Sequence, residues 1–132
     1  MDTLFSNVSV VTMDEQMHVY LDAYVGVTDG KISYLAKKAP EEKPETIVDG
    51  TGMVLMPGLI NCHAHLPMAI LRGYADDYPL DVWLNEHIFP KEDRLDGRCV
   101  KAATLLGIAE SLRFGVTSFS EMYNFCDEIA EA

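Results

Sequence analysis

Two histidines, His63 and His65, are separated by one residue and follow an apolar run. This pattern constrains the fold more than any other feature. Residues i and i+2 of a β-strand lie on the same face, so the two imidazoles would project together while Cys62 and Ala64 point away. Neutral imidazole is the commonest metal ligand in proteins. Ligands at the carboxyl end of a strand, followed here by Pro67 and a loop, are typical of a parallel α/β barrel.

A His-x-His pair alone is weak evidence for a metal, because two half-buried histidines can also be satisfied by backbone partners. The surrounding sequence is more specific. Residues 57–68 read Pro-Gly-Leu-Ile-Asn-Cys-His-Ala-His-Leu-Pro-Met, and they are followed by Leu-Arg-Gly at 71–73 and by Pro-Lys-Glu-Asp-Arg-Leu at 90–95. Together these stretches resemble the first barrel strand and the following segment of the amidohydrolase superfamily. Within it the chain is most similar to the methylthioadenosine/S-adenosylhomocysteine deaminases, near the chlorohydrolases and guanine deaminases.

The resemblance implies an α/β fold, namely the N-terminal part of a metal-dependent (β/α)8 TIM barrel preceded by strands of a small β-sandwich. We expect residues 1–56 to form the partial β-sandwich domain and residues 57–132 to form the first two β/α units of the barrel. A complete barrel typically needs about 250 residues, and this chain has 132. The barrel would therefore be incomplete, as in a truncated enzyme, half of a split enzyme or a pseudo-enzyme fragment.

Local patterns predict the elements of the first part. Asp29-Gly30 lies between two apolar runs and predicts a hairpin, because glycine accepts a positive φ at little cost. Residues 50–52, Gly-Thr-Gly, indicate a second turn. We therefore expect residues 1–56 to form an antiparallel sheet of several short strands.

The second part alternates strands and helices. Asp81 is a candidate N-cap for a helix that Pro90 would stop, and Asp96 is a candidate N-cap for a longer helix over 97–114. The residue after that helix, Gly115, is typical of a helix end. A second strand over 116–120 would follow and pair in parallel with the first.

The resemblance also implies roles for individual residues. His63 and His65 would bind the metal, and Glu92 would accept hydrogen bonds from the ribose hydroxyls of a nucleoside, although its charged surroundings also fit a solvated cluster. Trp83 would lie beside the nucleoside, with plain core packing as the equal alternative. Glu121 would lie behind the metal ligands at the end of the second strand, where the family often has aspartate. The general acid–base group and the remaining ligands of the family lie beyond this chain, so the isolated chain is expected to be inactive.

The implied reaction is deamination of an adenosine derivative, 5′-methylthioadenosine or S-adenosylhomocysteine, in which hydroxide generated at the metal attacks C6 of the adenine. The cofactor would be one divalent ion, zinc first, with iron and nickel left open because imidazole suits all three. Another amidohydrolase, such as a guanine deaminase or chlorohydrolase, is the alternative enzyme. The alternative from another class is an inactive fragment or half of a split enzyme, with a complementary chain or a second copy as its partner.

Composition excludes other classes of function. The chain has 21 acidic and 10 basic residues and a formal charge of −11, so a nucleic-acid or anionic-membrane surface is not expected. No basic leader and no membrane-length apolar run are visible. Three widely spaced cysteines fit a reducing cytoplasm, and Cys62 is expected to be a small buried thiol.

Overall fold

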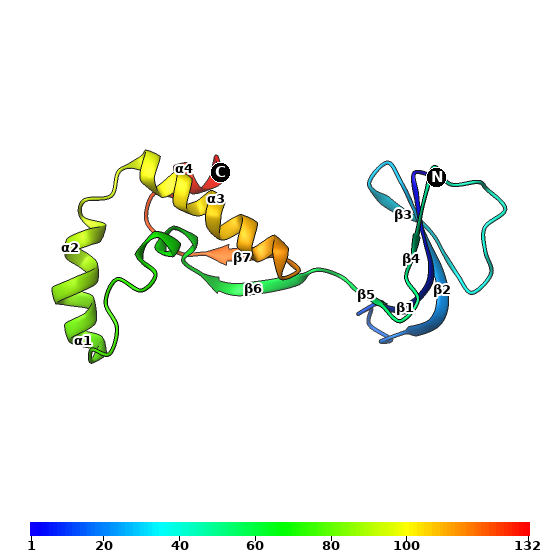
Figure 1. Ribbon diagram of the computed structural model, residues 1–132, viewed down its shortest axis with the longest axis horizontal. Coiled ribbons are helices and arrows are strands. Elements are labelled where there is room, and N and C mark those ends of the chain that lie inside the picture. The colour runs from blue at the N-terminus through cyan, green and yellow to red at the C-terminus, as the bar shows by residue number, and fades with distance from the viewer. The chain divides into compact units, whose positions relative to one another are not determined.

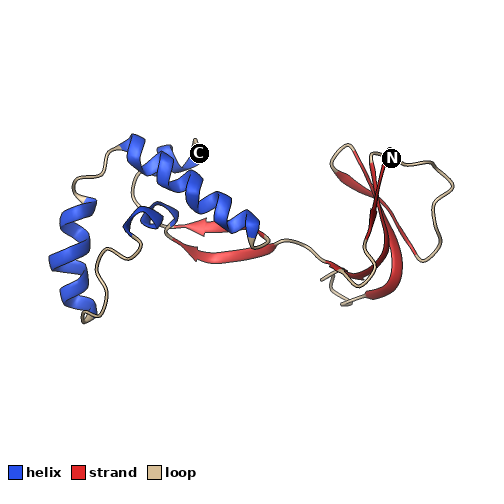
Figure 2. Ribbon diagram, viewed as in Figure 1, coloured by secondary structure: helices blue, strands red, loops and turns tan.

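The computed structural model describes all 132 residues, which divide into two compact units, Met1–Pro57 and Gly58–Ala132. Figure 1 shows the strands of the first unit in blue to green and the elements of the second unit in green to red. The first unit is built of strands, whereas the second combines helices with a pair of strands (Figure 2). No helix has both the length and the apolar character needed to cross a bilayer.

The first unit is a single mixed sheet in the order β3-β2-β1-β4, with β5 also paired to β1. Its strands are β1 (Thr3–Val11), β2 (Val19–Thr28), β3 (Lys31–Ala36), β4 (Thr46–Asp49) and β5 (Val54–Leu55). The β1–β2 and β2–β3 pairs are antiparallel. The predicted hairpin between β2 and β3 is confirmed, since Asp29 and Gly30 have φ values of 50° and 70°.

The prediction of an entirely antiparallel sheet is wrong, because β4 and β5 both run parallel to β1. The Gly-Thr-Gly turn does not fold β5 back onto β4. Instead, Gly50 N–H donates to the Ser6 carbonyl at 2.7 Å and Ser9 N–H donates to the Met53 carbonyl at 3.1 Å. These two bonds hold the turn against β1. As a result, β4 and β5 pair one after the other with successive parts of β1.

The second unit contains one parallel pair of strands, β6 (Leu59–Ala64) and β7 (Val116–Glu121). Its helical elements are η1 (Leu66–Leu71), α1 (Leu80–Val82), η2 (Trp83–Ile88), α2 (Phe89–Glu92), α3 (Gly97–Arg113) and α4 (Cys126–Ala130). The predicted order of strand, helix and parallel strand is confirmed. Because parallel strands end at the same edge of a sheet, this topology brings the ends of β6 and β7 together.

The long helix α3 begins and ends close to where the sequence predicts. Asp96 is its N-cap, and its Oδ1 accepts a hydrogen bond from Cys99 N–H at 2.8 Å. This bond to a backbone donor lowers the pKa of Asp96. Arg113 is the last helical residue, and Gly115, with φ of 78°, lies just beyond it.

Two details of the helical segment before α3 differ from the prediction. Asp81 does not cap the helix; Pro79 occupies the N-cap position and Asp81 lies in the first turn. Pro90 does not stop the helix either, and α2 continues to Glu92. The preceding η2 is a π-helix, in which Phe89 N–H donates to the Leu84 carbonyl, five residues back. The missing N–H of Pro90 falls where the hydrogen-bond register changes, so no bond is lost.

Helix η1 packs closely against α3, and this contact positions the end of β6. The side chain of Leu66 is buried there, and a Cβ added at Gly107 would lie 3.0 Å from the Leu66 carbonyl oxygen. A larger residue at this position would require Leu66 to move by a few tenths of an ångström. Arg72 at the end of η1 donates two hydrogen bonds to Glu110 of α3, at 2.8 and 2.6 Å. The pKa of Glu110 is lowered by the Arg72 guanidinium.

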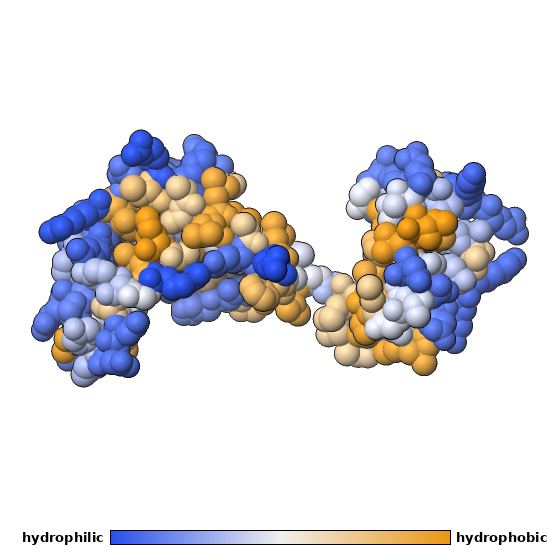
Figure 3. All heavy atoms as spheres, viewed as in Figure 1, coloured by the Kyte–Doolittle hydropathy of each residue, from blue (hydrophilic) through white to orange (hydrophobic).

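Large apolar side chains remain exposed on both units, as the orange areas in Figure 3 show. In the second unit Ile60 of β6 is 69% exposed, Leu112 of α3 is 60% exposed, and Phe114 is 75% exposed. The apolar residues of α3 leave little polar face, which is typical of a barrel helix packed between neighbours. In this chain one parallel pair of strands does not cover that surface.

We expect the purified 132-residue chain to associate or to be partly molten, because exposed apolar faces and unpaired strand edges promote aggregation. Light scattering after size exclusion and binding of an apolar dye measure this. Leu112→Lys should reduce association more than Ala109→Lys, which adds the same charge at an exposed position of the same helix. A monodisperse wild-type monomer with one sharp, cooperative thermal transition would contradict the expectation.

Candidate metal and nucleoside site

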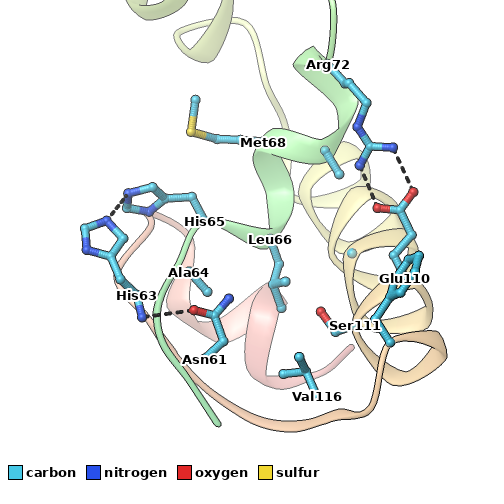
Figure 4. A pocket seen from close by; sticks show the side chains of 13 residues that line it. Asn61, His63, Ala64, His65, Leu66, Met68, Arg72, Glu110, Ser111 and Val116 are labelled. Carbon is cyan, nitrogen blue, oxygen red and sulfur yellow. Dashed lines mark hydrogen bonds and ion pairs between the residues drawn. The ribbon is translucent and has the colours of Figure 1, made fainter. Parts of the chain in front are cut away.

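The two histidines lie side by side at the carboxyl end of β6, as the spacing predicts (Figure 4). His63 is within the strand, and His65 follows it as the N-cap of η1. Their Nε2 atoms are 3.2 Å apart, and the rings meet nearly edge to face with centroids 4.9 Å apart. They line one wall of an open cavity of about 600 Å³.

The close approach of the two Nε2 atoms suits a cation. Two imidazoles protonated on Nδ1 would each present a lone pair at Nε2, and these lone pairs repel unless a proton or a metal ion lies between them. Asn61 helps to set the strand end, since its Oδ1 accepts a hydrogen bond from His63 N–H at 3.2 Å. The donor set therefore fits a divalent transition metal that prefers imidazole nitrogen.

Glu121 lies behind this pair at the end of β7, with a side chain that is 12% exposed. Its Oε2 accepts a hydrogen bond from Leu66 N–H at 2.7 Å, and its Oε1 accepts from Met122 N–H and Tyr123 N–H at 2.9 and 3.0 Å. The Nδ1 atom of His65 is buried without a hydrogen-bond partner, 3.8 Å from Glu121 Oε1. Glu121 thus joins the ends of both strands and faces the far side of the His65 ring.

The chain by itself offers an incomplete set of metal ligands. No cluster of three or more His, Cys, Asp or Glu side chains that could hold a metal ion is present. A catalytic zinc site ordinarily has three protein ligands and a water. Cys62 does not supply a third ligand, and the prediction that it is buried is wrong: its side chain is exposed, because no element of the second unit covers that position of β6.

A second pocket, of about 280 Å³, gathers three of the residues predicted from the sequence. His65, Trp83 and Glu92 all line it, although they lie in three separate segments: the turn after β6, η2 and α2. Trp83 Nε1–H donates to the Ala75 carbonyl at 2.9 Å, which leaves the apolar ring as the part available for contact. The pocket therefore combines an imidazole, an indole and a carboxylate.

Tyr123 also lines this pocket, and the sequence reasoning missed it. Its hydroxyl donates a hydrogen bond to Glu92 Oε1 at 2.7 Å. Burial, and then the bond to Glu92, raise the pKa of Tyr123 well above its usual value. Its position two residues after the acidic end of β7 was a usable signal, because residues just beyond barrel strands line the site face.

The parallel β6–α3–β7 arrangement, with ligand-type side chains at the strand ends, is the strand–helix–strand unit that is repeated in a (β/α)8 barrel. Residues 54–132 match the model of the amidohydrolase family. The chain belongs to the amidohydrolase family.

Relatives with similar sequences are deaminases of adenosine derivatives. The chain is 46% identical to the 5′-deoxyadenosine deaminase of Methanothermobacter thermautotrophicus over 106 residues, 80% of this chain and 25% of that protein. It is 39% identical to the 5-methylthioadenosine/S-adenosylhomocysteine deaminase of Thermoanaerobacter pseudethanolicus, over 100% of this chain and 31% of the relative.

A solved structure agrees with these sequence matches. An adenosine deaminase from Xanthomonas campestris with bound zinc matches with a TM-score of 0.87 and 39% identity, over 98% of this chain and 30% of that one. The chain thus spans only a quarter to a third of the length of each of these three proteins.

We expect Glu121→Ala to loosen the strand ends, because the main-chain N–H groups of Leu66 and Tyr123 lose their only acceptor, whereas Met122 N–H also donates to the Ala64 carbonyl. Each such loss costs about 1–3 kcal/mol when the donor is kept from water. Hydrogen exchange at Leu66 and Tyr123 should become faster. Glu131→Ala, which removes the same charge from an exposed ion pair with Lys101, should leave those rates unchanged. Equal protection of the Leu66 amide in both variants would contradict this role of Glu121.

Proposed function

We propose that this chain is the N-terminal part of a metal-dependent aminohydrolase that deaminates adenosine derivatives such as 5′-methylthioadenosine or S-adenosylhomocysteine. The observation that carries the proposal is the pocket of about 280 Å³ in which His65 of the histidine pair lies beside Trp83 and Glu92. Metal-type and nucleoside-type side chains share one cavity there. The deaminase relatives support the same reaction class.

The metal would be held by Nε2 of His63 and His65, with Glu121 holding His65 in place through its neighbours. Zinc is the first choice, supported by the zinc in the Xanthomonas structure and by the imidazole donors. A bound divalent metal supplies a Lewis acid that activates water near neutral pH. Because this chain offers only two ligands, the remaining ligands and the general acid–base group would come from residues outside it, and we expect the isolated chain to be inactive.

The nucleoside would be held by Glu92 and Trp83. The substrates named for the relatives differ at the 5′ position but share an adenine ring and a 2′,3′-diol. A carboxylate only accepts hydrogen bonds, so Glu92 suits the two hydroxyl donors of a ribose. The Trp83 ring would contact the apolar faces of the nucleoside. A deaminase of a free base has no diol to bind, so Glu92 distinguishes the two substrate classes.

We also assign residues 1–56 to a partial β-sandwich domain and residues 57–132 to the first two β/α units of the barrel domain. The two compact units and the change from a mixed sheet to a parallel pair support this division. The exposed apolar side chains of both units support a complement, either the rest of the same polypeptide or a second chain.

In the full-length protein, His63→Ala or His65→Ala should remove both metal and activity, because each change deletes a ligand. We expect metal affinity to fall by more than roughly 10–100-fold, which is the usual cost of losing even an outer partner of a ligand. Metal analysis after dialysis and a deamination assay measure the two effects. His18→Ala, which removes a histidine paired with Asp14 in the first unit, is the control. Stoichiometric metal in the double variant His63→Ala/His65→Ala would refute the proposed metal site.

In the same protein, Glu92→Gln should leave the metal in place and weaken nucleoside binding. Loss of one charge-assisted hydrogen bond to a ribose hydroxyl costs about 1.5–3 kcal/mol. The measurement is kcat/KM with 5′-methylthioadenosine, beside the metal content. Glu86→Gln, an exposed glutamate of η2, serves as the matched control. If Glu92→Gln strips the metal or leaves the kinetics on every nucleoside unchanged, the substrate assignment fails.

A further inference from the structure

The carboxylate proposed to bind the ribose already has one partner in the chain. Tyr123 Oη–H donates to Glu92 Oε1 at 2.7 Å, across 31 residues of sequence, and this is the only hydrogen bond of the Glu92 side chain. Glu92 ends α2, whereas Tyr123 follows β7. Both side chains line the pocket of about 280 Å³, so their contact lies where the nucleoside would bind.

The direction of this hydrogen bond is set by chemistry. A carboxylate has no proton to give, so the phenol must be the donor. Burial and the neighbouring carboxylates raise the pKa of Tyr123, so the hydroxyl keeps its proton over the working range of an enzyme. Tyr123 therefore takes one of the two acceptor positions of Glu92 Oε1 and leaves the other, and both of those on Oε2, free to accept.

The main chain of Tyr123 is fixed by the carboxylate that also lies behind His65. Tyr123 N–H donates to Glu121 Oε1 at 3.0 Å, and Glu121 Oε2 accepts from Leu66 N–H, directly after His65, at 2.7 Å. The rings of His65 and Tyr123 have centroids 6.1 Å apart. One short segment, Glu121 to Tyr123, thus contacts both the residue after the histidine pair and Glu92.

We propose that Tyr123 is a positioning residue that fixes the Glu92 carboxylate for recognition of a ribose 2′,3′-diol. This inference rests on the proposed function and adds a specificity determinant to it. A glutamate side chain has many rotamers, and holding it in one before the substrate arrives reduces the entropy lost on binding. Removing the tyrosine hydroxyl should weaken recognition of the diol and leave the deamination step itself unchanged.

The kinetic test compares 5′-methylthioadenosine with its 2′,3′-dideoxy analogue in the full-length protein. For Tyr123→Phe we expect KM for the diol substrate to rise roughly 5- to 10-fold, the usual effect of one net hydrogen bond. The kcat should stay within about twofold, and KM for the analogue should not change. In the double variant with Glu92→Gln, the loss should be no greater than that of Glu92→Gln alone. Tyr34→Phe, whose hydroxyl donates to the Lys38 carbonyl in the first unit, is the matched control.

Three outcomes would overturn the positioning role. These are wild-type kinetics for Tyr123→Phe while Glu92→Gln loses the preference for the diol, an equal loss on both substrates, and additive losses in the double variant. Failure of the proposed function looks different: the unaltered protein deaminates neither nucleoside, or Glu92→Gln keeps the full preference for the diol.

A second measurement tests the contact without any activity, in the full-length protein. Carbon-13 labelling at tyrosine Cζ reports on hydrogen bonding of the phenol at neutral pH, and Tyr123→Phe identifies its signal. Glu92→Gln should shift that signal and no other tyrosine signal. An unmoved Tyr123 signal would overturn the proposal.

Discussion

The Glu121 carboxylate at the end of β7 accepts three main-chain N–H groups, and the candidate site depends on these bonds. One donor, Leu66, follows β6, and the other two, Met122 and Tyr123, follow β7. At the carboxyl ends of the two strands, the last main-chain bond runs from Met122 N–H to the Ala64 carbonyl at 3.3 Å, so another group must hold the chain beyond that point. A carboxylate with two oxygens can do this for both strands at once. The positions of His65 and Tyr123 follow from it.

The site also depends on how closely η1 approaches α3. The absence of a side chain at Gly107 allows the Leu66 carbonyl to lie against the helix, and the Arg72–Glu110 pair holds the other end of η1. The ion pair is exposed, so we assign it a role in geometry more than in stability. The turn after β6 is therefore fixed at both ends. This arrangement holds His65 so that its ring meets that of His63.

The two proposed subsites share elements and are coupled through them. Tyr123 contacts Glu92 through its hydroxyl and Glu121 through its main chain, while Glu121 faces the buried nitrogen of His65. A single residue, Tyr123, thus connects Glu92, the carboxylate proposed to bind the ribose, with Glu121, which supports the histidine pair. In a deaminase this connection would keep the adenine ring in register with the metal, because the ribose and the ligands are positioned by the same strand end.

Much of this molecule could be predicted from sequence by itself, because the determining interactions are local. Side chains alternate along a β-strand, and this predicts that His63 and His65 lie on one face. Asp96 and Gly115 predict the ends of α3, and Asp29-Gly30 predicts the hairpin. Tertiary structure alone decided the rest. β4 and β5 pair in parallel with β1 because hydrogen bonds from distant residues anchor their turn, and Pro90 is tolerated because a π-helix precedes it. The contact between Tyr123 and Glu92 joins residues far apart in the chain, and no periodicity in a sequence encodes which side chains long-range packing brings together.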